Sequence, residues 1–384
     1  MIISRLKLKN WRNFKEADIE LGDRAFFVGP NAAGKSNLLD VFRFLRDIAK
    51  AGGGLQKAIT DRGGLSKIRC LAARAYPDIE IEVHLSDFAG QKPTWEYAIG
   101  IKQEVRGYRQ PYLSYERVRF KRTVLVNRPS DNAEDEKDKL RLTQTYLEQI
   151  NANAKFREIY RFFESALYLH LIPQLLRYPE AFSGPGLPED PFGRSFLERV
   201  ARTPEKYRKA RLKKIEKALR FAVPQLKHLT DVKDERGVPH LEAIYEHWRP
   251  KGAKQREDQM SDGTLRLIGL LWSLLEGEAL LLLEEPELSL NATIVNKLPA
   301  LIYRLQRQKK RQVLISTHSA DLLLDKGIAG DEVILLTPGL EGTTVRAASS
   351  IKEIKDLLEA GLPIAEAVLP HTAPKDIGQL ELFK

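Results

Sequence analysis

Apolar and polar positions alternate over the first third of the chain. Two alternating segments within residues 1–21 predict a hairpin that leads into the apolar run 25–28. The same period of two returns in three later segments, at residues 79–85, 95–101 and 113–126. Together these three segments predict an antiparallel β-sheet.

Helical periodicity dominates from about residue 140 to residue 221, which predicts an inserted helical lobe. After residue 263 the rhythm is that of an α/β protein, with helices expected at 265–275 and 293–307 and strands at 279–283, 313–316 and 332–336. The fold class is therefore α/β. We expect three parts: an N-terminal lobe with the antiparallel sheet at 1–135, a helical insertion at 136–225 and a C-terminal lobe at 226–384.

The composition excludes some classes of protein but does not identify a function. The chain has 384 residues, 43% of them hydrophobic, and a formal net charge of +10. Its apolar runs are too short to cross a bilayer, and its first residues resemble a β-strand rather than a signal peptide, so we expect a cytoplasmic protein without a membrane partner. A single cysteine, Cys70, excludes an intramolecular disulfide and a cysteine-based zinc cluster.

Positive charge is concentrated in three segments. Seven basic residues fall on one predicted helix: Lys206, Arg208, Lys209, Arg211, Lys213, Lys214 and Lys217. Two further basic segments lie within 106–122 and 307–311. Each segment alone is typical of a solvated face, whereas together they favour DNA or RNA as a partner. The candidate DNA-binding surface is the basic helix, with the basic segment at 106–122 as the alternative.

The most specific motif is Gly-Pro-Asn-Ala-Ala-Gly-Lys-Ser at residues 29–36, between the apolar run 25–28 and a helical pattern that reaches Ile48. Here the glycines let backbone N–H groups surround a phosphate, Lys35 adds charge, and Ser36 can bind Mg²⁺. The motif predicts an ATP or GTP site; an ordinary glycine turn is the alternative. The expected nucleotide-binding residues of this segment are Asn31, Ala32, Ala33, Gly34, Lys35, Ser36 and Asn37.

A run of leucines ends in the carboxylates Glu284 and Glu285. Such a strand places acids at the sheet edge where a phosphate loop also lies, so Glu284 is expected to hold Mg²⁺ and Glu285 to polarise the attacking water. The alternative is a buried strand with a solvated acidic end. After the next strand, His318 can donate a hydrogen bond to the γ-phosphate, although an isolated histidine is more often structural.

A second helix start that can bind an anion is expected at Ser261, Asp262 and Gly263. One chain then has a single phosphate loop but two phosphate-binding helix ends. This arrangement suggests a dimer in which Ser261 of each subunit closes on the nucleotide held by Lys35 of the other.

These motifs and their order resemble the ABC-type ATPase heads of the RecF, SMC and OLD (overcoming lysogenization defect) group. The opening Lys-Asn-Trp-Arg-Asn-Phe at 9–14 also resembles that group, and the segments 261–266 and 284–290 look closest to OLD-like ATPases, including those of anti-phage defence. The resemblance implies that Arg12 and Asn13 lie near the phosphates and that Ser289 and Asn291 belong to a D-loop that crosses a dimer interface. About sixty residues follow His318, too few for the Toprim nuclease domain of OLD proteins.

The resemblance implies an ATPase that uses ATP and Mg²⁺, dimerises or forms a higher homo-oligomer, and couples its cycle to DNA and to a separate effector. A Toprim-type nuclease is the expected effector, in anti-phage defence or DNA repair. The main alternative is a nucleotide-locked scaffold or sensor with little turnover; a transporter subunit is disfavoured by the long insertion. The weakest alternative is a nuclease site among four late acids: Asp321, Asp325, Asp331 and Glu332.

Overall fold

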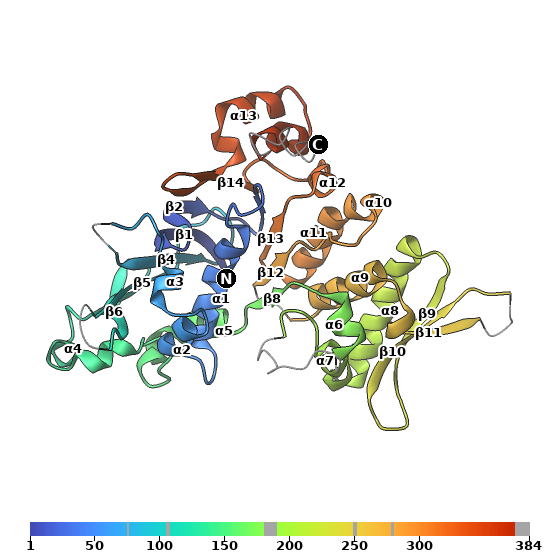
Figure 1. The fold of residues 1–384 in the computed structure, drawn as a ribbon, viewed down its shortest axis with the longest axis horizontal. Helices are drawn as coiled ribbons and strands as arrows, with labels where there is room; N and C mark the ends of the chain where they lie inside the picture. The colour runs from blue at the N-terminus through green and yellow to red at the C-terminus, as the bar shows by residue number, and fades with distance from the viewer. Residues whose placement is uncertain (75–76, 105–107, 180–189, 249–251, 278–279, 373–384) are drawn as a thin grey trace, which may run out of the picture. The chain divides into compact units, whose positions relative to one another are not determined.

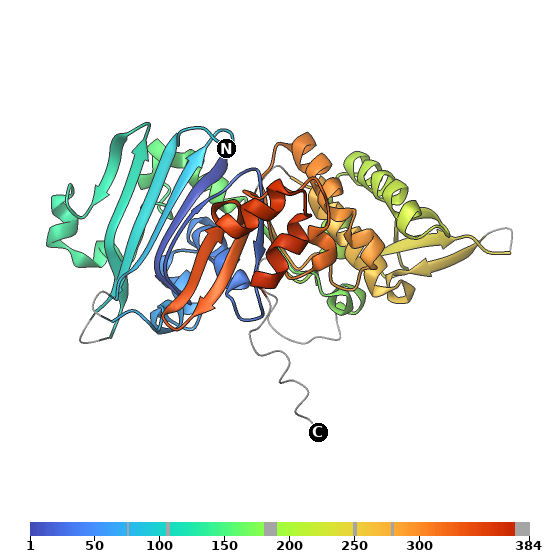
Figure 2. The ribbon, with the colours of Figure 1, turned by 90° about the horizontal axis from the view of Figure 1, so that it is seen from above.

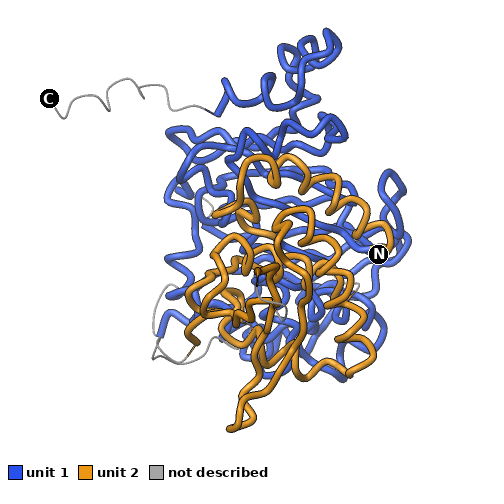
Figure 3. Tube along the Cα trace, turned by 90° about the vertical axis from the view of Figure 1, so that its right-hand side faces the viewer, with its two compact units in different colours: residues 1–167, 279–282, 311–384 blue, residues 168–278, 283–310 orange. Residues whose placement is uncertain are grey.

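A computed structural model describes residues 1–74, 77–104, 108–179, 190–248, 252–277 and 280–372, and the chain divides into two units. Unit 1 comprises residues 1–167, 279–282 and 311–384, and unit 2 comprises residues 168–278 and 283–310 (Figure 3). The chain passes from one unit to the other within strands β8 (Leu167–Leu169) and β12 (Leu281–Glu284).

Unit 1 contains a six-stranded antiparallel sheet in the order β2-β1-β4-β5-β6-β7. Its strands are β1 (Ile2–Trp11), β2 (Phe14–Glu20), β4 (Ile79–Ser86), β5 (Trp95–Gln103), β6 (Pro111–Phe120) and β7 (Thr123–Arg128), seen side by side in Figure 2. The predicted hairpin and the predicted antiparallel sheet are both confirmed, and they form one sheet because β1 pairs with β4.

The second sheet has the order β15-β14-β3-β13-β12-β8. Its remaining strands are β3 (Arg24–Val28), β13 (Val313–Thr317), β14 (Val333–Gly339) and β15 (Gly342–Ala347) (Figure 1). Strand β3 is parallel to both β13 and β14, and every residue of β3 and β13 is buried. Their complete burial and mostly apolar residues are those of central parallel strands covered on both faces.

The longest helix of unit 1 is α1 (Lys35–Ala49), which follows β3 directly. The other helices of this unit are short: α2 (Leu55–Thr60), α3 (Leu65–Ile68), α4 (Ala133–Lys137), α5 (Arg157–Glu164), α12 (Ala320–Leu323), α13 (Lys352–Glu359) and α14 (Ile364–Val368). Apolar residues of α1 face the core over most of its length, so its N-terminal end has a fixed direction.

Unit 2 is mainly helical, with α6 (Pro173–Arg177), α7 (Phe196–Arg202), α8 (Glu205–Ala222), α9 (Asp262–Leu275), α10 (Ala292–Val295) and α11 (Leu298–Lys309). It also holds a three-stranded antiparallel sheet of β9 (Leu226–Lys233), β10 (Pro239–Tyr245) and β11 (Ala253–Arg256), which the sequence did not predict. Helix α8 packs against β9 and α9.

The unit boundaries differ from the three ranges expected from the sequence. Glu116 on β6 is fully buried, accepts hydrogen bonds from the backbone N–H groups of Tyr146 (2.7 Å) and Leu147 (3.2 Å), and pairs with Arg128 (3.1 Å). These contacts hold the start of the expected helical insertion within unit 1. The single helix expected at 293–307 is also divided, because Pro299 lies in the first turn of α11, where its missing N–H is tolerated.

Candidate functional site: a phosphate loop, two carboxylates and a capped helix

The loop between β3 and α1 has the backbone geometry of a phosphate cradle. Gly34 has φ 95° and Ala32 has φ 63°, both in the left-handed region. A Cβ atom on Gly34 would lie 2.1 Å from Nδ2 of Asn13, so no larger residue fits without displacing that side chain. Helix α1 begins at Lys35, which directs its first backbone N–H groups toward the loop.

Lys35 is buried, and its ammonium donates hydrogen bonds to the carbonyl oxygens of Gly29 (2.8 Å) and Pro30 (3.0 Å). Asn31, Ala32 and Ser36 are exposed along the crest of the loop. The lysine charge is therefore held inside the loop, and the exposed Ser36 lies next to it at the start of α1, where a phosphate and its cation would bind.

Asn13 ties this loop to the rest of unit 1. Its Nδ2 donates to the carbonyl of Ala33 (2.9 Å) and to Oγ1 of Thr343 (2.7 Å), and its Oδ1 accepts from Nδ2 of Asn37 (2.9 Å). Thr343 on β15 also donates to Ala33 (2.9 Å). Sequence reasoning missed Thr343, because it lies some three hundred residues from the loop in a segment with no motif.

Arg12 lies beside Asp40 on α1, with an Nη2–Oδ2 distance of 2.6 Å. Arg62 pairs with the same carboxylate at 2.9 Å. Burial acts to raise the pKa of Asp40, but the charges of Arg62 and Arg12 outweigh it and hold that pKa below its usual value. Arg12 therefore neutralises an acid of the helix that follows the phosphate loop; Asp40 and Arg62 were not among the predicted residues.

His318 leaves the sheet at the same end as the phosphate loop. Thr317 is the parallel register partner of Val28, so the residues that follow each, His318 and Gly29, emerge from neighbouring strands at one edge. His318 is exposed, and the next residue, Ser319, caps α12 by accepting a hydrogen bond from the N–H of Leu322 (3.3 Å).

The predicted carboxylates and the second helix start belong to unit 2. Glu284 ends β12, and its side chain accepts a hydrogen bond from the hydroxyl of Tyr168. Glu285 follows with φ 44°, a left-handed conformation that a non-glycine residue adopts only where the surroundings impose it. Its carbonyl oxygen accepts from Nη1 of Arg266 (3.4 Å) and from the N–H of Leu288 (3.3 Å).

Ser261 caps α9: its Oγ accepts from the N–H of Thr264 at 3.2 Å. The next residue, Asp262, is held by Arg177 (2.6 Å) and by Gln174 (3.0 Å), both on α6. A Cβ atom on Gly263 would lie 2.7 Å from the carbonyl oxygen of Ser289, so the helix start and the expected D-loop are in close contact.

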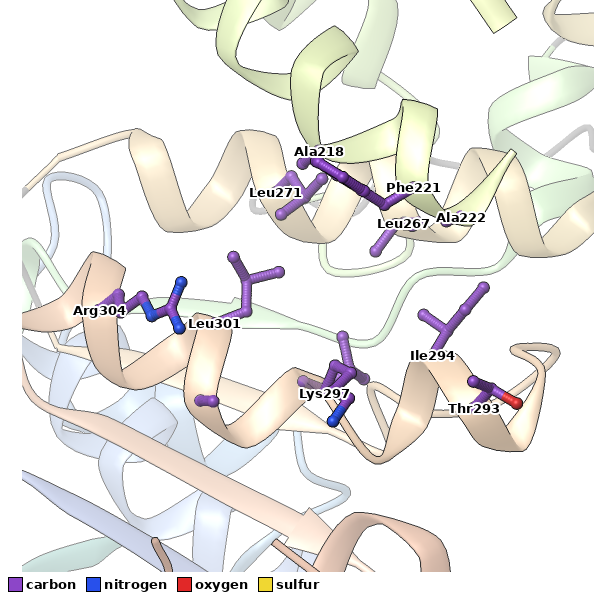
Figure 4. Close-up of a pocket in the computed structure, with 12 residues that line it drawn as sticks. Ala218, Phe221, Ala222, Leu267, Leu271, Thr293, Ile294, Lys297, Leu301 and Arg304 are labelled. Carbon is purple, nitrogen blue, oxygen red and sulfur yellow. The ribbon is translucent and has the colours of Figure 1, made fainter. Parts of the chain in front are cut away.

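This contact forms one wall of a pocket of about 390 Å³ that is lined by Ser261, Asp262, Gly263, Ser289 and Asn291 among others. The pocket continues into an apolar groove of about 460 Å³ between α8, α9, α10 and α11, because Ala222, Leu267 and Ile294 line both. Figure 4 shows Ile294 and Leu301 extending toward α9 across this groove. The residues of the predicted second helix start and of the predicted D-loop thus share one concave surface.

The seven basic residues predicted for DNA binding do not all face solvent. Arg208 pairs with Asp231 (2.8 Å), and Arg211 lies over the ring of Trp272 (5.2 Å to the centroid) and near Glu276 (3.8 Å). The other five, Lys206, Lys209, Lys213, Lys214 and Lys217, are exposed, and Lys209 pairs with Glu205 at 2.5 Å. Arg208 and Arg211 therefore hold α8 in place, and the assignment of the seven residues to a DNA-binding surface stays a prediction.

The late acids have other contacts. Glu332 pairs with the buried Arg24 (2.7 Å), and Asp325 accepts a hydrogen bond from the N–H of Gly327 (2.7 Å). No group of three histidine, cysteine or acidic side chains suited to a metal ion occurs in the part of the chain that the structure describes. Among the described helices, none combines the length and apolar content needed to cross a membrane.

Solved structures of SMC heads share the fold of this chain. An SMC head bound to the C-terminal winged-helix domain of ScpA matches with a TM-score of 0.52 and 14% identity over 90% of this chain and 97% of that one. An SMC head from Pyrococcus furiosus with an extended coiled coil, bound to the C-terminal domain of ScpA, matches with a TM-score of 0.50 and 14% identity over 93% and 99%. The fold is that of an ABC-type P-loop ATPase head.

Residues 24–325 match the family described as "AAA domain, putative AbiEii toxin, Type IV TA system". The match covers most of the chain, so the protein belongs to this family of P-loop ATPases. No curated protein sequence matches it significantly. The predicted resemblance to the RecF and SMC group is confirmed at the level of the ATPase fold, whereas the closer likeness to OLD proteins stays a prediction.

Proposed function

We propose that the protein is a Mg²⁺-dependent ATPase that binds ATP in the 29–36 loop and hydrolyses it. The observation that carries this proposal is the loop geometry: left-handed Gly34, buried Lys35 and the exposed Ser36 surround the N-terminus of α1. Mg²⁺ prefers hard oxygen ligands, and the hydroxyl of Ser36 and the carboxylate of Glu284 are ligands of this kind. Ser36 and Glu284 would hold the cation, which would neutralise phosphate charge.

The protein's own residues then have distinct tasks. Lys35 exchanges its bonds to the loop carbonyls for phosphate oxygens, which are stronger acceptors. Asn13 and Thr343 keep the loop in its binding shape. Glu285 orients and polarises the attacking water, and His318 donates a hydrogen bond to the γ-phosphate.

We further propose that two subunits associate head to head when ATP binds. The support is the pocket at the start of α9, where Ser261 and the backbone around Gly263 offer a second anion-binding helix end beside the exposed Ser289 and Asn291. In this arrangement the Ser261 pocket of each subunit contacts the nucleotide of the other.

We propose that the ATP cycle is coupled to DNA and to a separate effector, a Toprim-type nuclease, in anti-phage defence or DNA repair in the cytoplasm. The exposed lysines of α8 support DNA as the ligand, because they form a stripe that can neutralise phosphates. The similarity of motifs to OLD-like ATPases supports the effector class.

A mixing experiment tests ATP hydrolysis and the exchange of sites between subunits together. Lys35→Ala and Ser261→Arg are each expected to abolish turnover alone. When the two variants are mixed in equal amounts with ATP, a dimer that neither variant forms alone should appear, because each mixed pair has one complete site, made of the intact loop of one subunit and the intact Ser261 of the other. Absence of this mixed dimer would contradict the head-to-head arrangement. If the Lys35→Ala variant keeps the turnover of the wild type, the 29–36 loop is not the site of ATP hydrolysis and the proposed function is wrong.

A further inference from the structure

Arg266 lies on the same helix as the capped end at Ser261, just over one turn further on, and it is buried. Its Nη1 donates to the carbonyl oxygen of Glu285 at 3.4 Å. Burial lowers the pKa of this guanidinium, whereas the carboxylates of Glu287, Asp262 and Glu285 act to raise it. The cation therefore lies among acidic groups that come from both the helix start and the turn after β12.

The turn after β12 has a strained backbone, which the hydrogen bond from Arg266 can stabilise. Glu285 has φ 44° and Ser289 has φ 63°, two left-handed non-glycine residues within five positions. Such conformations cost on the order of 1–3 kcal/mol each and persist only where neighbouring groups over-determine them. The Glu285 carbonyl that Arg266 contacts belongs to the first of these residues, so the guanidinium is placed to stabilise the backbone conformation from which the Glu285 side chain extends.

A second contact makes the helix start and this turn one block. The backbone of Gly263 packs so closely on the carbonyl of Ser289 that an added Cβ atom would lie 2.7 Å from it. A shift of the N-terminal end of α9 therefore reaches the turn at both of its ends, through Gly263 at residue 289 and through Arg266 at residue 285.

We propose that Arg266 is a positioning residue that links the Ser261 helix end to the catalytic carboxylate of the same subunit. This inference rests on the proposed function, in which Ser261 acts on the nucleotide of the other subunit and Glu285 on its own. Binding of the other subunit's phosphate at the α9 end then sets the Glu285 turn, so that hydrolysis in one site depends on occupation of the other. Such dependence is a coupling between two sites through one packed element.

The test compares Arg266→Met and Arg266→Lys in the full chain, with Arg177→Met as the matched control. Arg177 also holds the α9 start, through Met260 and Asp262, but makes no described contact with Glu285. Three quantities are measured: ATP affinity, ATP-dependent dimer mass, and turnover.

Arg266→Met should bind ATP and dimerise as the wild type does but lose turnover by about 10²-fold, since a displacement of about 1 Å at a catalytic group has that effect. An ATP-bound dimer should accumulate. Arg266→Lys, which keeps a donor for the Glu285 carbonyl, should fall between the wild type and Arg266→Met. Arg177→Met should instead weaken dimer formation without trapping it.

Wild-type turnover in Arg266→Met, or loss of the dimer to the same extent as in Arg177→Met, would overturn the proposal. Amide hydrogen exchange at residues 285–290 gives a readout that does not require turnover: Arg266→Met should raise it and Arg177→Met should not. If the wild type itself neither dimerises nor hydrolyses ATP, the proposed function fails, and unchanged exchange in Arg266→Met then overturns the positioning role separately. If Arg266→Met does not fold, Arg266→Lys alone decides by the same two readouts.

Discussion

Replacing Gly34 by alanine perturbs the phosphate loop in a way that the structure makes calculable. At φ 95° a Cβ atom costs about 1 kcal/mol or somewhat more in backbone strain. The same atom would lie 2.1 Å from Nδ2 of Asn13, so the amide must leave its place and its three hydrogen bonds to Ala33, Thr343 and Asn37 are lost. At about 1 kcal/mol for each bond, the substitution should cost about 4 kcal/mol in unfolding free energy.

A double-mutant cycle with Asn13→Ala tests this reasoning. Asn13→Ala alone removes the three hydrogen bonds and should cost about 3 kcal/mol. In that background Gly34→Ala adds only the backbone strain, so the double variant should lose about 4 kcal/mol rather than the additive value of about 7 kcal/mol. The difference of about 3 kcal/mol is the predicted coupling energy.

Urea unfolding followed by tryptophan fluorescence measures the cycle. Trp11 is a local reporter, because it is fully buried and donates its Nε1–H to the carbonyl of Asn37 at 2.8 Å. Thr343→Val serves as the control, since it removes bonds of the same network without adding a Cβ atom near Gly34. A coupling energy below about 0.5 kcal/mol would mean that the two sites are independent, and the steric argument would be wrong.

Three other predictions concern contacts elsewhere in the chain. Asp40→Asn should destabilise the protein by about 3–5 kcal/mol at neutral pH, because it removes the charge that Arg62 and Arg12 surround. The pKa of Asp40 is lower in the folded protein than in the unfolded chain. The stabilisation by its ion pairs is therefore fully present above the unfolded pKa, about 4, and is lost as the pH falls through the folded pKa. A stability difference between the wild type and Asp40→Asn that persists unchanged in acid would contradict the assignment. Tyr168→Phe should raise the Mg²⁺ concentration needed for half-maximal turnover with ATP affinity unchanged, because Glu284 loses its hydroxyl donor; an unaltered Mg²⁺ titration would show that the hydroxyl is dispensable. Lys213→Glu with Lys214→Glu should weaken binding to double-stranded DNA and flatten its salt dependence. The control Arg208→Gln should lower stability but leave DNA affinity and its salt dependence unchanged. Unchanged DNA binding in the double lysine variant would place the DNA on another surface.

Local patterns made the phosphate loop and its neighbours predictable. The run 25–28, the glycines and the helix after Lys35 are adjacent in sequence, so one short segment contains all the information for the motif. The supports of that loop were not predictable, because Thr343 and Asn13 meet through chain topology across more than three hundred residues. Arg266 lies inside a recognised motif, but its contact with the Glu285 carbonyl depends on how α9 packs on the turn after β12.

Helix α8 shows a signal that was present but not used. Arg208 and Arg211 fall on the same helical face as Leu212, Ile215 and Leu219, which are buried. That periodicity indicates that the two arginines point inward to partners, as they do. The three-stranded sheet after α8 was missed for another reason: its buried positions, such as Leu229 and Leu241, are few and separated by charged residues on the opposite face.

ATP turnover and molecular mass, measured on the purified wild type and on Glu285→Gln with and without ATP and double-stranded DNA, test the central claim most directly. The account predicts that the wild type hydrolyses ATP faster when DNA is present, and that Glu285→Gln accumulates as an ATP-bound dimer or larger assembly with little turnover. Tight ATP binding without turnover and without any change of mass in either protein would contradict it and would instead support a nucleotide-locked scaffold.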